Sequence, residues 1–326
     1  MRGTVPVALM GLIFTVTPLS AAGIEDQEIA FLSRRDGNFE VYLRCRDGRE
    51  LNLTQNPAQD YGLSWAPAGW RLAFATNRDG NEEIYQLRLG DGALLNLTQN
   101  PANDGQPAWS PDGRRIAFFS DREGDTADPL ERRELYVLEL ASNSVRRLTT
   151  NSVYEESPAW TADGKGITFC RMRPRPTRAA PSICDLWTID VETGSEKQLT
   201  SREGFSSGAS RGLAGLPMLF HGREGTHDIF TLDPANGEVK NLTRDSPQDW
   251  QPAWSADGTE IIWCAGLPPK SFDIWVMKAD GTERRRLVSN PDRDEWPALR
   301  PYGATKGGPC DPNAPPWVRA SLPPQP

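Results

Sequence analysis

Residues 107–118 read PAWSPDGRRIAF, and variants of this stretch recur through most of the chain. A tryptophan ends a short apolar segment, Ser-Pro-Asp-Gly follows, and a second apolar segment begins after two arginines. Pro-Asp-Gly is typical of a tight reversal, because glycine accepts a positive φ and the aspartate side chain bonds the backbone of its own turn. The stretch therefore predicts two antiparallel strands joined by a turn. We expect the tryptophan to be a packing residue and not a catalytic one.

A leucine near the end of each copy marks the period of the repeat. The copies are 44, 51, 51, 43 and 45 residues apart, with a carboxylate usually seven residues after the leucine and a tryptophan usually twelve residues after it. In the copy quoted, residues 107–109, 115–120, 134–140 and 145–149 are predicted to form four short strands. Four strands in about 40–45 residues make one propeller blade. The six leucines are Leu53, Leu97, Leu148, Leu199, Leu242 and Leu287.

The two ends of the repeated region complete one another. The first copy, residues 29–54, lacks an opening strand, and residues 297–303 form an opening strand with nothing after it. We therefore predict an all-β fold, a six-bladed β-propeller of four-stranded antiparallel blades, closed when the C-terminal strand completes the N-terminal blade. Closure removes edge strands that would otherwise pair with other chains. The predicted blades are 29–54 with 297–303, 61–98, 105–149, 156–200, 206–243 and 250–288.

The first residues of the chain predict export. One arginine precedes an apolar run at residues 5–16, and Ser20 and Ala22 fit the small-residue rule for cleavage after Ala22. Residues 1–22 are therefore interpreted as a signal peptide. A membrane anchor is the alternative, although the run is shorter than the ~20 residues of a spanning helix. The sequence predicts a periplasmic or secreted chain with no membrane span after cleavage.

Charge and composition narrow the classes of function. The 326 residues hold 36 basic and 44 acidic side chains, a formal net charge of −8. Such an acidic chain is poorly suited to bind nucleic acid or an anionic membrane. We expect a propeller at residues 23–303, a flexible proline-rich tail at residues 304–326, and no nucleic-acid partner.

The WSPDG turn, the IAF strand and the closing LT pair resemble the TolB-type propeller repeat, a relative of the WD repeat, over about 275 residues. The resemblance implies a periplasmic propeller that works with a protein partner, as TolB-type proteins work with Pal, in maintenance of the cell envelope. Members of that family carry a small α/β domain ahead of the propeller. Only a few residues separate the predicted leader from the first blade, so we expect the propeller without that domain, as a monomer.

Functional residues are expected where the repeat is interrupted. In an antiparallel blade, the connection into the opening strand and the hairpin between strands two and three lie on one face. That face gathers the repeated carboxylates near the channel mouth, with insertions at residues 121–134 and 171–182. Loops on a rigid scaffold often carry binding. The candidate partner-binding residues are Asp60, Asp104, Glu155, Asp249, Asp294, Asp125, Asp128, Arg171, Arg173, Arg175 and Arg178.

Two other interpretations of the repeated carboxylates stay open. Each aspartate is of a type that bonds the backbone of the turn it begins. Alternatively, carboxylates around a channel mouth would suit a cation such as calcium, which prefers oxygen ligands. The sequence shows no pattern typical of a particular metal or cofactor site, and no cofactor is predicted.

The remaining motifs do not favour catalysis. Residues 204–208, GFSSG, match the G-x-S-x-G nucleophile elbow around Ser206, but that motif needs a strand-to-helix turn and a base further along the chain. Strands are predicted here, and the two histidines, His221 and His227, are interpreted as solvated residues flanking a hairpin. We therefore predict a non-enzymatic binding module with no catalytic residue. A glycan- or small-ligand-binding propeller with lyase or hydrolase activity is the alternative.

Five cysteines are present, and an exported chain permits disulfides. Cys170 and Cys184 bracket the second insertion, so a disulfide between them is predicted. Pairing of Cys45 with Cys310 stays open, and it would leave Cys264 as a free thiol on a buried strand.

Overall fold

The structure is a computed structural model that describes residues 23–123, 133–151, 153–174, 182–210, 213, 215–244, 248–266, 272–301 and 308–313. The predicted signal peptide and most of the predicted tail lie outside these ranges. Within the described ranges, no helix is long and apolar enough to cross a membrane.

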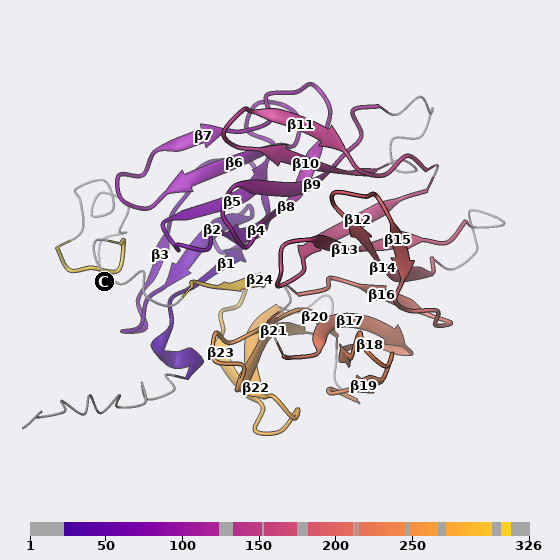
Figure 1. Ribbon diagram of the computed structural model, residues 1–326. Helices are drawn as coiled ribbons and strands as arrows, with labels where there is room; N and C mark the ends of the chain where they lie inside the picture. The colour runs from indigo at the N-terminus through magenta and orange to yellow at the C-terminus, as the bar shows by residue number, and fades with distance from the viewer. Residues whose placement is uncertain are drawn as a thin grey trace, which may run out of the picture.

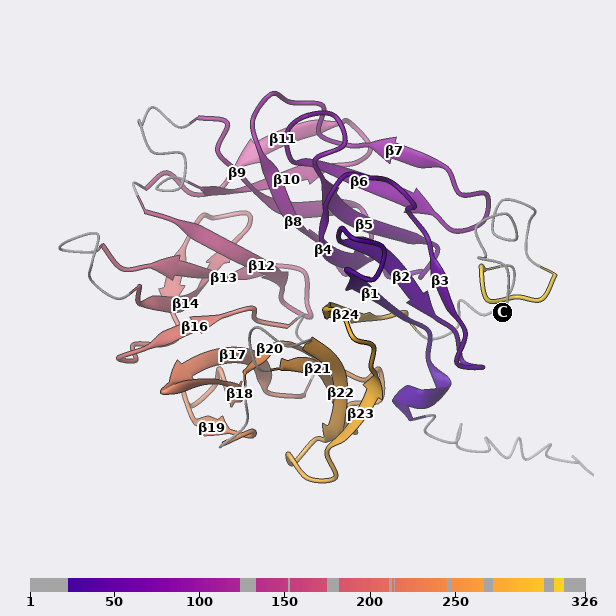
Figure 2. The same ribbon diagram turned by 180° about the vertical axis from the view of Figure 1, so that it is seen from behind.

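The described chain folds into strands arranged around a common centre (Figures 1 and 2). One short 3₁₀ helix, η1 (Ile24–Asp26), precedes them. The strands form six groups of four, and in every group but the first the strands follow one another in chain order. The first three groups are β24 (Asp294–Leu299), β1 (Ile29–Ser33), β2 (Glu40–Arg44) and β3 (Glu50–Asn52); β4 (Asp60–Trp65), β5 (Arg71–Thr76), β6 (Glu83–Arg88) and β7 (Leu94–Asn96); and β8 (Asp104–Trp109), β9 (Arg115–Ser120), β10 (Glu134–Glu139) and β11 (Ser144–Arg147).

The other three groups complete the ring. They are β12 (Glu155–Trp160), β13 (Gly166–Met172), β14 (Cys184–Asp190) and β15 (Glu196–Gln198); β16 (Phe205–Ser207), β17 (Met218–Glu224), β18 (Thr226–Leu232) and β19 (Val239–Asn241); and β20 (Asp249–Trp254), β21 (Glu260–Gly266), β22 (Phe272–Lys278) and β23 (Arg285–Val288). We call these groups blades one to six in the order given, and the first strand of each its inner strand. The four-stranded antiparallel blades of the predicted propeller are thus confirmed.

Two details differ from the predicted blades. Inner strands begin earlier than expected; β24 begins at Asp294 rather than at residue 297. Blades four and five share one continuous sheet, because β14 and β16 pair in parallel at a single position, Cys184 with Phe205. The inner strand of blade five has only three residues, so it makes a short contact with its own blade and a further contact with the neighbouring one.

The ring closes as the sequence predicts. β24 pairs antiparallel with β1, with Ile29 opposite Leu299 and Ser33 opposite Asp294. The Arg300 guanidinium follows directly, forming a buried ion pair with Glu28 and donating from Nε to the Gly69 carbonyl oxygen at 2.7 Å. Because Glu28 and Gly69 lie far from Arg300 in sequence, these contacts fasten both ends of the propeller to its first two blades.

Further covalent and polar contacts hold the terminal segments. The Ile24 backbone N–H donates to Glu260 Oε2 at 2.8 Å, joining η1 to blade six. A disulfide joins Cys45 to Cys310, with 5.5 Å between the Cα atoms. A second disulfide joins Cys170 to Cys184 across the base of the β13–β14 hairpin. Cys264 is a free, buried thiol.

Tryptophans pack between neighbouring blades, as the repeat predicts. Trp109 of blade three lies in one core cluster with Ala73 and Ile84 of blade two. The indole Nε1 of Trp160 donates to the Ala108 carbonyl oxygen at 2.9 Å, which joins blade four to blade three. A large ring that buries apolar area fixes one blade against the next, and in Trp160 the indole N–H is satisfied as well.

A bulge recurs in the inner strands. The third residue of the six-residue inner strands has a φ between 50° and 60°, as does Gly208 of blade five. The pairing with the second strand shifts register at this point in five of the six blades. A bulge re-aims side chains and adds twist, so each inner strand changes direction where it meets the channel. The six residues with this positive φ are Gly62, Gln106, Ser157, Gly208, Gln251 and Trp296.

The two disulfides should contribute unequally to stability. They close segments with sequence separations of 265 and 14 residues, and a longer loop loses more entropy in the unfolded chain when it is crosslinked. Replacing Cys45 and Cys310 with alanine should therefore lower the free energy of unfolding by about 5 kcal/mol, against about 3 kcal/mol for the Cys170 and Cys184 pair. Equilibrium unfolding in guanidinium chloride measures both losses. An equal or inverted order would contradict the ring-fastening role of the longer crosslink.

Candidate functional site: the inner strands and their channel

The five repeated carboxylates occupy one equivalent position. Each is the first residue of its inner strand, and each side chain is fully buried. An exposed acidic surface at the channel mouth was expected here, and burial removes it, because these side chains have no accessible surface with which to contact a partner. We call them the rim carboxylates. They are Asp60, Asp104, Glu155, Asp249 and Asp294.

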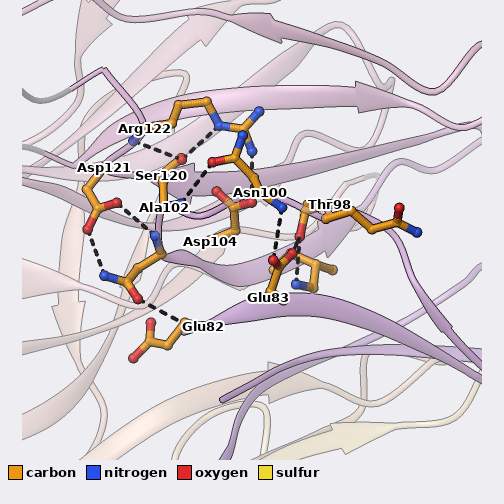
Figure 3. Close-up of polar contacts among 12 residues, drawn as sticks. Glu82, Glu83, Thr98, Asn100, Ala102, Asp104, Ser120, Asp121 and Arg122 are labelled. Carbon is orange, nitrogen blue, oxygen red and sulfur yellow. Dashed lines mark hydrogen bonds and ion pairs between the residues drawn. The ribbon is translucent and has the colours of Figure 1, made fainter. Parts of the chain in front are cut away.

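Figure 3 shows how one of them is held. Arg122 Nη2 donates to Asp104 Oδ2 at 2.8 Å, and Arg122 Nε donates to Ser120 Oγ at 2.9 Å. The guanidinium also lies over the Phe118 and Tyr136 rings, 5.2 and 5.1 Å from their centroids. Beside it, Thr98 Oγ1 donates to Glu83 at 2.7 Å. Asp104 therefore takes part in an internal ion pair with side chains rather than in a bond to the backbone of its own turn.

The same pairing recurs around the ring. Ion pairs join Asp60 to Arg78 at 3.5 Å, Glu155 to Arg171 at 2.7 Å and Asp294 to Arg35 at 3.4 Å. Asp249 accepts from the Trp263 indole at 2.9 Å. In blade five the equivalent residue is the buried Ser206.

Burial dominates the ionisation of the rim carboxylates. Loss of water raises the pKa of Asp60 to about 6, against the effect of the Thr54 and Thr76 hydroxyls and the charge of Arg78. Burial likewise raises the pKa of Glu155 to about 6, although Arg171 favours the ionised form.

The predicted arginines divide into two kinds. Arg171 binds Glu155 and also Glu196 at 2.7 Å, and it lies over the Trp187 ring, so it is an internal residue. Arg173 donates to Asp185 Oδ2 at 2.6 Å, which leaves its side chain partly exposed but already paired. The other four candidates in the insertions, Asp125, Asp128, Arg175 and Arg178, lie outside the described residues.

An open cavity runs between the inner strands. Its volume is about 670 Å³, and residues from the inner strand of every blade line it. We call the second and third residues of the inner strands the channel-mouth layer, counting from Ser206 in blade five. The members of this layer that line the cavity are Gly62, Gln106, Glu156, Ser157, Ser207, Gly208, Trp250, Gln251, Glu295 and Trp296.

Neighbouring members of the layer are bonded to one another. The Ser157 backbone N–H donates to Gln106 Oε1 at 2.6 Å, and the Trp296 backbone N–H donates to Gln251 Oε1 at 3.0 Å. Ser207 Oγ donates to Glu156 Oε1 at 3.0 Å. These bonds cross from blade to blade, so the layer is a connected wall rather than a set of independent side chains.

His221 lines the cavity and His227 stacks on Trp250 of its wall, so the histidines are not solvated hairpin residues, which corrects the expectation from sequence. His221 is buried, and its Nδ1 accepts from the Gln251 backbone N–H at 3.4 Å. His227 stacks on Trp250 with 3.9 Å between ring centroids, and Phe205 packs on both histidines. A Cβ on Gly208 would lie 2.3 Å from His221 Cε1, so glycine is required at that point.

Burial also determines the charge of these histidines. It lowers the pKa of His221 to about 3 and that of His227 to about 4, with smaller contributions from the neighbouring His227 and Arg223 charges respectively. Both rings are therefore neutral near pH 7, and they present an uncharged aromatic surface.

The described residues place no hydrogen-bonded base at Ser206, the serine of the GFSSG motif. Ser206 Oγ is buried and has no hydrogen-bond partner in the described chain, and His221 Nδ1 already accepts a backbone N–H. A serine nucleophile needs a base within hydrogen-bond reach. Across the described ranges, no group of three or more His, Cys, Asp or Glu side chains is placed to hold a metal ion.

The channel-mouth layer was not singled out from the sequence. Gln106 and Gln251 are the third residues of their inner strands and Glu156 is the second residue of its own, and all three lie between a repeated carboxylate and a repeated Pro-Ala-Trp segment. The sequence did contain a signal for this layer, because these positions differ from copy to copy while their neighbours recur.

The inner strands, the bulges and the open channel define the chain as a β-propeller. A family model described as the TolB beta propeller domain matches residues 15–180, which is half of the chain, and the chain belongs to this family.

Individual relatives agree with this assignment. An uncharacterized protein of Agrobacterium fabrum is 26% identical over 187 residues, covering 51% of this chain but only 61% of that relative. The crystal structure of TolB from Acinetobacter baumannii superposes with a TM-score of 0.72 at 22% identity, covering 86% of this chain and 68% of that chain. A candidate TolB from Agrobacterium tumefaciens superposes with a TM-score of 0.64 at 21% identity, covering 82% and 91%. At these identities the structural likenesses establish the fold.

Removing one rim arginine tests the internal role of the ion pairs. Arg122→Met should lower the free energy of unfolding at pH 7 by about 3–5 kcal/mol, because Asp104 would remain buried and charged without its partner. The loss should shrink as the pH falls toward 5, since burial already raises the pKa of Asp104 and the variant would raise it further. Urea unfolding at several pH values measures this. Arg88→Met, which breaks an exposed pair with Asp91, is the control and should cause no measurable change.

For the buried histidines we expect stability to fall as the pH falls, which is the opposite of the effect of a buried carboxylate with a raised pKa. Between pH 6.5 and about 4 the unfolded chain binds a proton at His221 that the folded chain does not, so folding weakens as the pH falls. The stability of the parent protein relative to His221→Gln should therefore fall by on the order of 1.4 kcal/mol per pH unit in this window. The carboxylates are common to both proteins and cancel in the difference. Parallel stability curves would contradict the burial of a neutral imidazole.

Proposed function

We propose that this propeller is a non-enzymatic binding protein that takes up a segment of a protein or peptide partner at its channel mouth. The observation that carries the proposal is the open cavity of about 670 Å³, walled by amides, hydroxyls and indoles that are held by blade-to-blade hydrogen bonds. Binding cavities commonly have volumes of about 300–1,000 Å³, with a few fixed polar groups among apolar ones.

The chemistry of the wall suits a polypeptide segment. Trp250 and Trp296 offer rigid aromatic surface, and the Gln106 and Gln251 amides offer both donors and acceptors beside it. Aromatic residues are enriched at protein interfaces because they bury a large area at low entropic cost. The rim carboxylates play a different part in this proposal: their ion pairs hold the strands that form the wall.

Membership of the TolB beta propeller family supports a protein partner and a place in cell-envelope maintenance. We propose a periplasmic or secreted monomer. The insertions that contain Asp125, Asp128, Arg175 and Arg178 are proposed as secondary contacts, since the turns that carry them leave the blades on the face where the inner strands begin. Arg173 contributes there only if a partner displaces its bond to Asp185.

Site-specific photocrosslinking tests the location of binding. A photoreactive phenylalanine analogue in place of Gln106, in the cavity wall, should crosslink a polypeptide in cells of the source organism. The same analogue in place of Arg88, exposed on β6, is the matched control and should not give that product. Identical products from both positions, or a crosslinked glycan that survives protease treatment, would overturn the proposal. The second result would favour the glycan-binding alternative.

A further inference from the structure

One carboxylate in the cavity wall differs from the others in its partners. Two glutamates of the channel-mouth layer line the cavity, Glu156 of blade four and Glu295 of blade one. Glu295 accepts from Arg293 Nε at 2.6 Å, so its charge is compensated. Glu156 has no lysine, arginine or histidine nitrogen within 4.0 Å in the described chain.

The partners that Glu156 does have are hydroxyl groups. Ser207 Oγ donates to its Oε1 at 3.0 Å, and the Tyr154 hydroxyl donates to its Oε2 at 3.2 Å. The neighbouring Arg133 is directed elsewhere, since it pairs with Glu82 at 3.7 Å and lies over the Tyr154 ring. Two hydroxyl donors orient the carboxylate, and the charge of Arg133 favours its ionised form without forming an ion pair with it.

A partly buried carboxylate without an ion-pair partner is unfavourable when ionised, so it either takes up a proton or gains from a cation brought beside it. Burial raises the pKa of Glu156, against the hydrogen bonds from Ser207 and Tyr154 and the charge of Arg133. A cation placed beside it would favour the ionised form and so would be bound more tightly than its uncharged isostere.

The surroundings favour an organic cation over a metal ion. Calcium takes six to eight oxygen ligands, usually with several carboxylates among them, whereas Glu156 is accompanied by hydroxyls from Ser207 and Tyr154. An ammonium or guanidinium group needs one carboxylate, a few acceptors and an apolar passage for its stem. The cavity offers these, with Ser157 Oγ 3.2 Å from Ser207 Oγ and indoles further along the wall.

We propose that Glu156 is the specificity-determining residue of the channel and receives a lysine or arginine side chain of the bound polypeptide. The proposal rests on the proposed function and makes it more specific: the partner segment that enters the channel carries a positive charge. Ser207 and Tyr154 are positioning residues that hold the carboxylate toward the cavity.

Small amides of single amino acids test this without knowledge of the partner. N-acetyl-lysine methylamide and N-acetyl-arginine methylamide should shift the indole NMR signals of Trp250 and Trp296 in the full chain, in a saturable way. N-acetyl-norleucine methylamide, which keeps the stem and lacks the charge, should bind at least tenfold more weakly. Glu156→Gln should weaken binding of the lysine probe at least tenfold and abolish its advantage over norleucine.

Two further variants keep the test interpretable. Glu192→Gln removes an equal charge from an exposed position and should leave binding of the lysine probe unchanged. Glu156→Asp keeps the charge and should retain the preference for lysine over norleucine even if it folds less stably. The proposal is overturned if norleucine binds as well as lysine, if Glu156→Gln changes nothing, or if no probe shifts the two indoles. Calcium that displaces the lysine probe would overturn it in favour of a metal site.

The crosslinking experiment separates this proposal from the one on which it rests. If the Gln106 crosslinker captures the same polypeptide with and without Glu156→Gln, and equally well, the channel binds a partner but not through a cation at Glu156. If no polypeptide is captured in either protein, the proposed function itself fails, whatever the small probes do.

Discussion

Closure of the ring by β24 on β1 is the constraint on which the remaining structure depends. Each blade buries its faces only against its two neighbours, so an open ring would expose one face at each end. The closing strand comes from the C-terminal end of the repeated region and the rest of the blade from its N-terminal end. The buried Arg300–Glu28 pair and the Cys45–Cys310 disulfide also join the two ends of the repeated region. Long-range contacts are therefore concentrated where loss of strand pairing would open the ring.

The rim carboxylates then position the inner strands within the closed ring. Burying a carboxylate costs free energy, which a partner such as Arg122 offsets only when the two groups meet in good geometry. The Asp104–Arg122 pair therefore favours one placement of the strand start over others. Two residues later the bulge at Gln106 turns the next side chain toward the cavity. The ion pair and the bulge fix the backbone, and the backbone then sets the direction of the channel-mouth side chains.

Features that recur were predictable, because a repeat reports the environment shared by all its copies. The blades, the ring closure and the packing of tryptophans such as Trp160 all follow from spacing and residue type. The state of the carboxylates did not follow, because an aspartate at a strand start is compatible with both exposure and burial. The sequence carried one sign that these carboxylates are buried and paired, an arginine two residues after the second strand, as at Arg122 and Arg78.

Blade four shows why even that signal is insufficient. Its carboxylate is a glutamate, one methylene longer, and it pairs with Arg171 inside the second strand. Arg173, which occupies the position of Arg122, binds Asp185 instead. Blade four exchanges ion-pair partners because a longer carboxylate occurs together with an arginine at the position of Ser120, and no spacing rule records that. The cluster of His221, His227 and Trp250 was also beyond sequence reasoning, because it joins blades five and six through contacts between residues far apart in the chain.

The division between shared and unshared positions locates specificity within the fold. Positions that recur are committed to contacts between blades, and altering them costs stability before it alters binding. A residue with positive φ recurs at the third position in every blade, yet the side chains at the second and third positions range from glycine to glutamate and tryptophan. The backbone conformation is shared at these positions, whereas the side-chain chemistry differs between blades. In such a cavity a single substitution changes the chemistry that a ligand meets, and the Glu156 carboxylate, which has no ion-pair partner in the described chain, is one such difference.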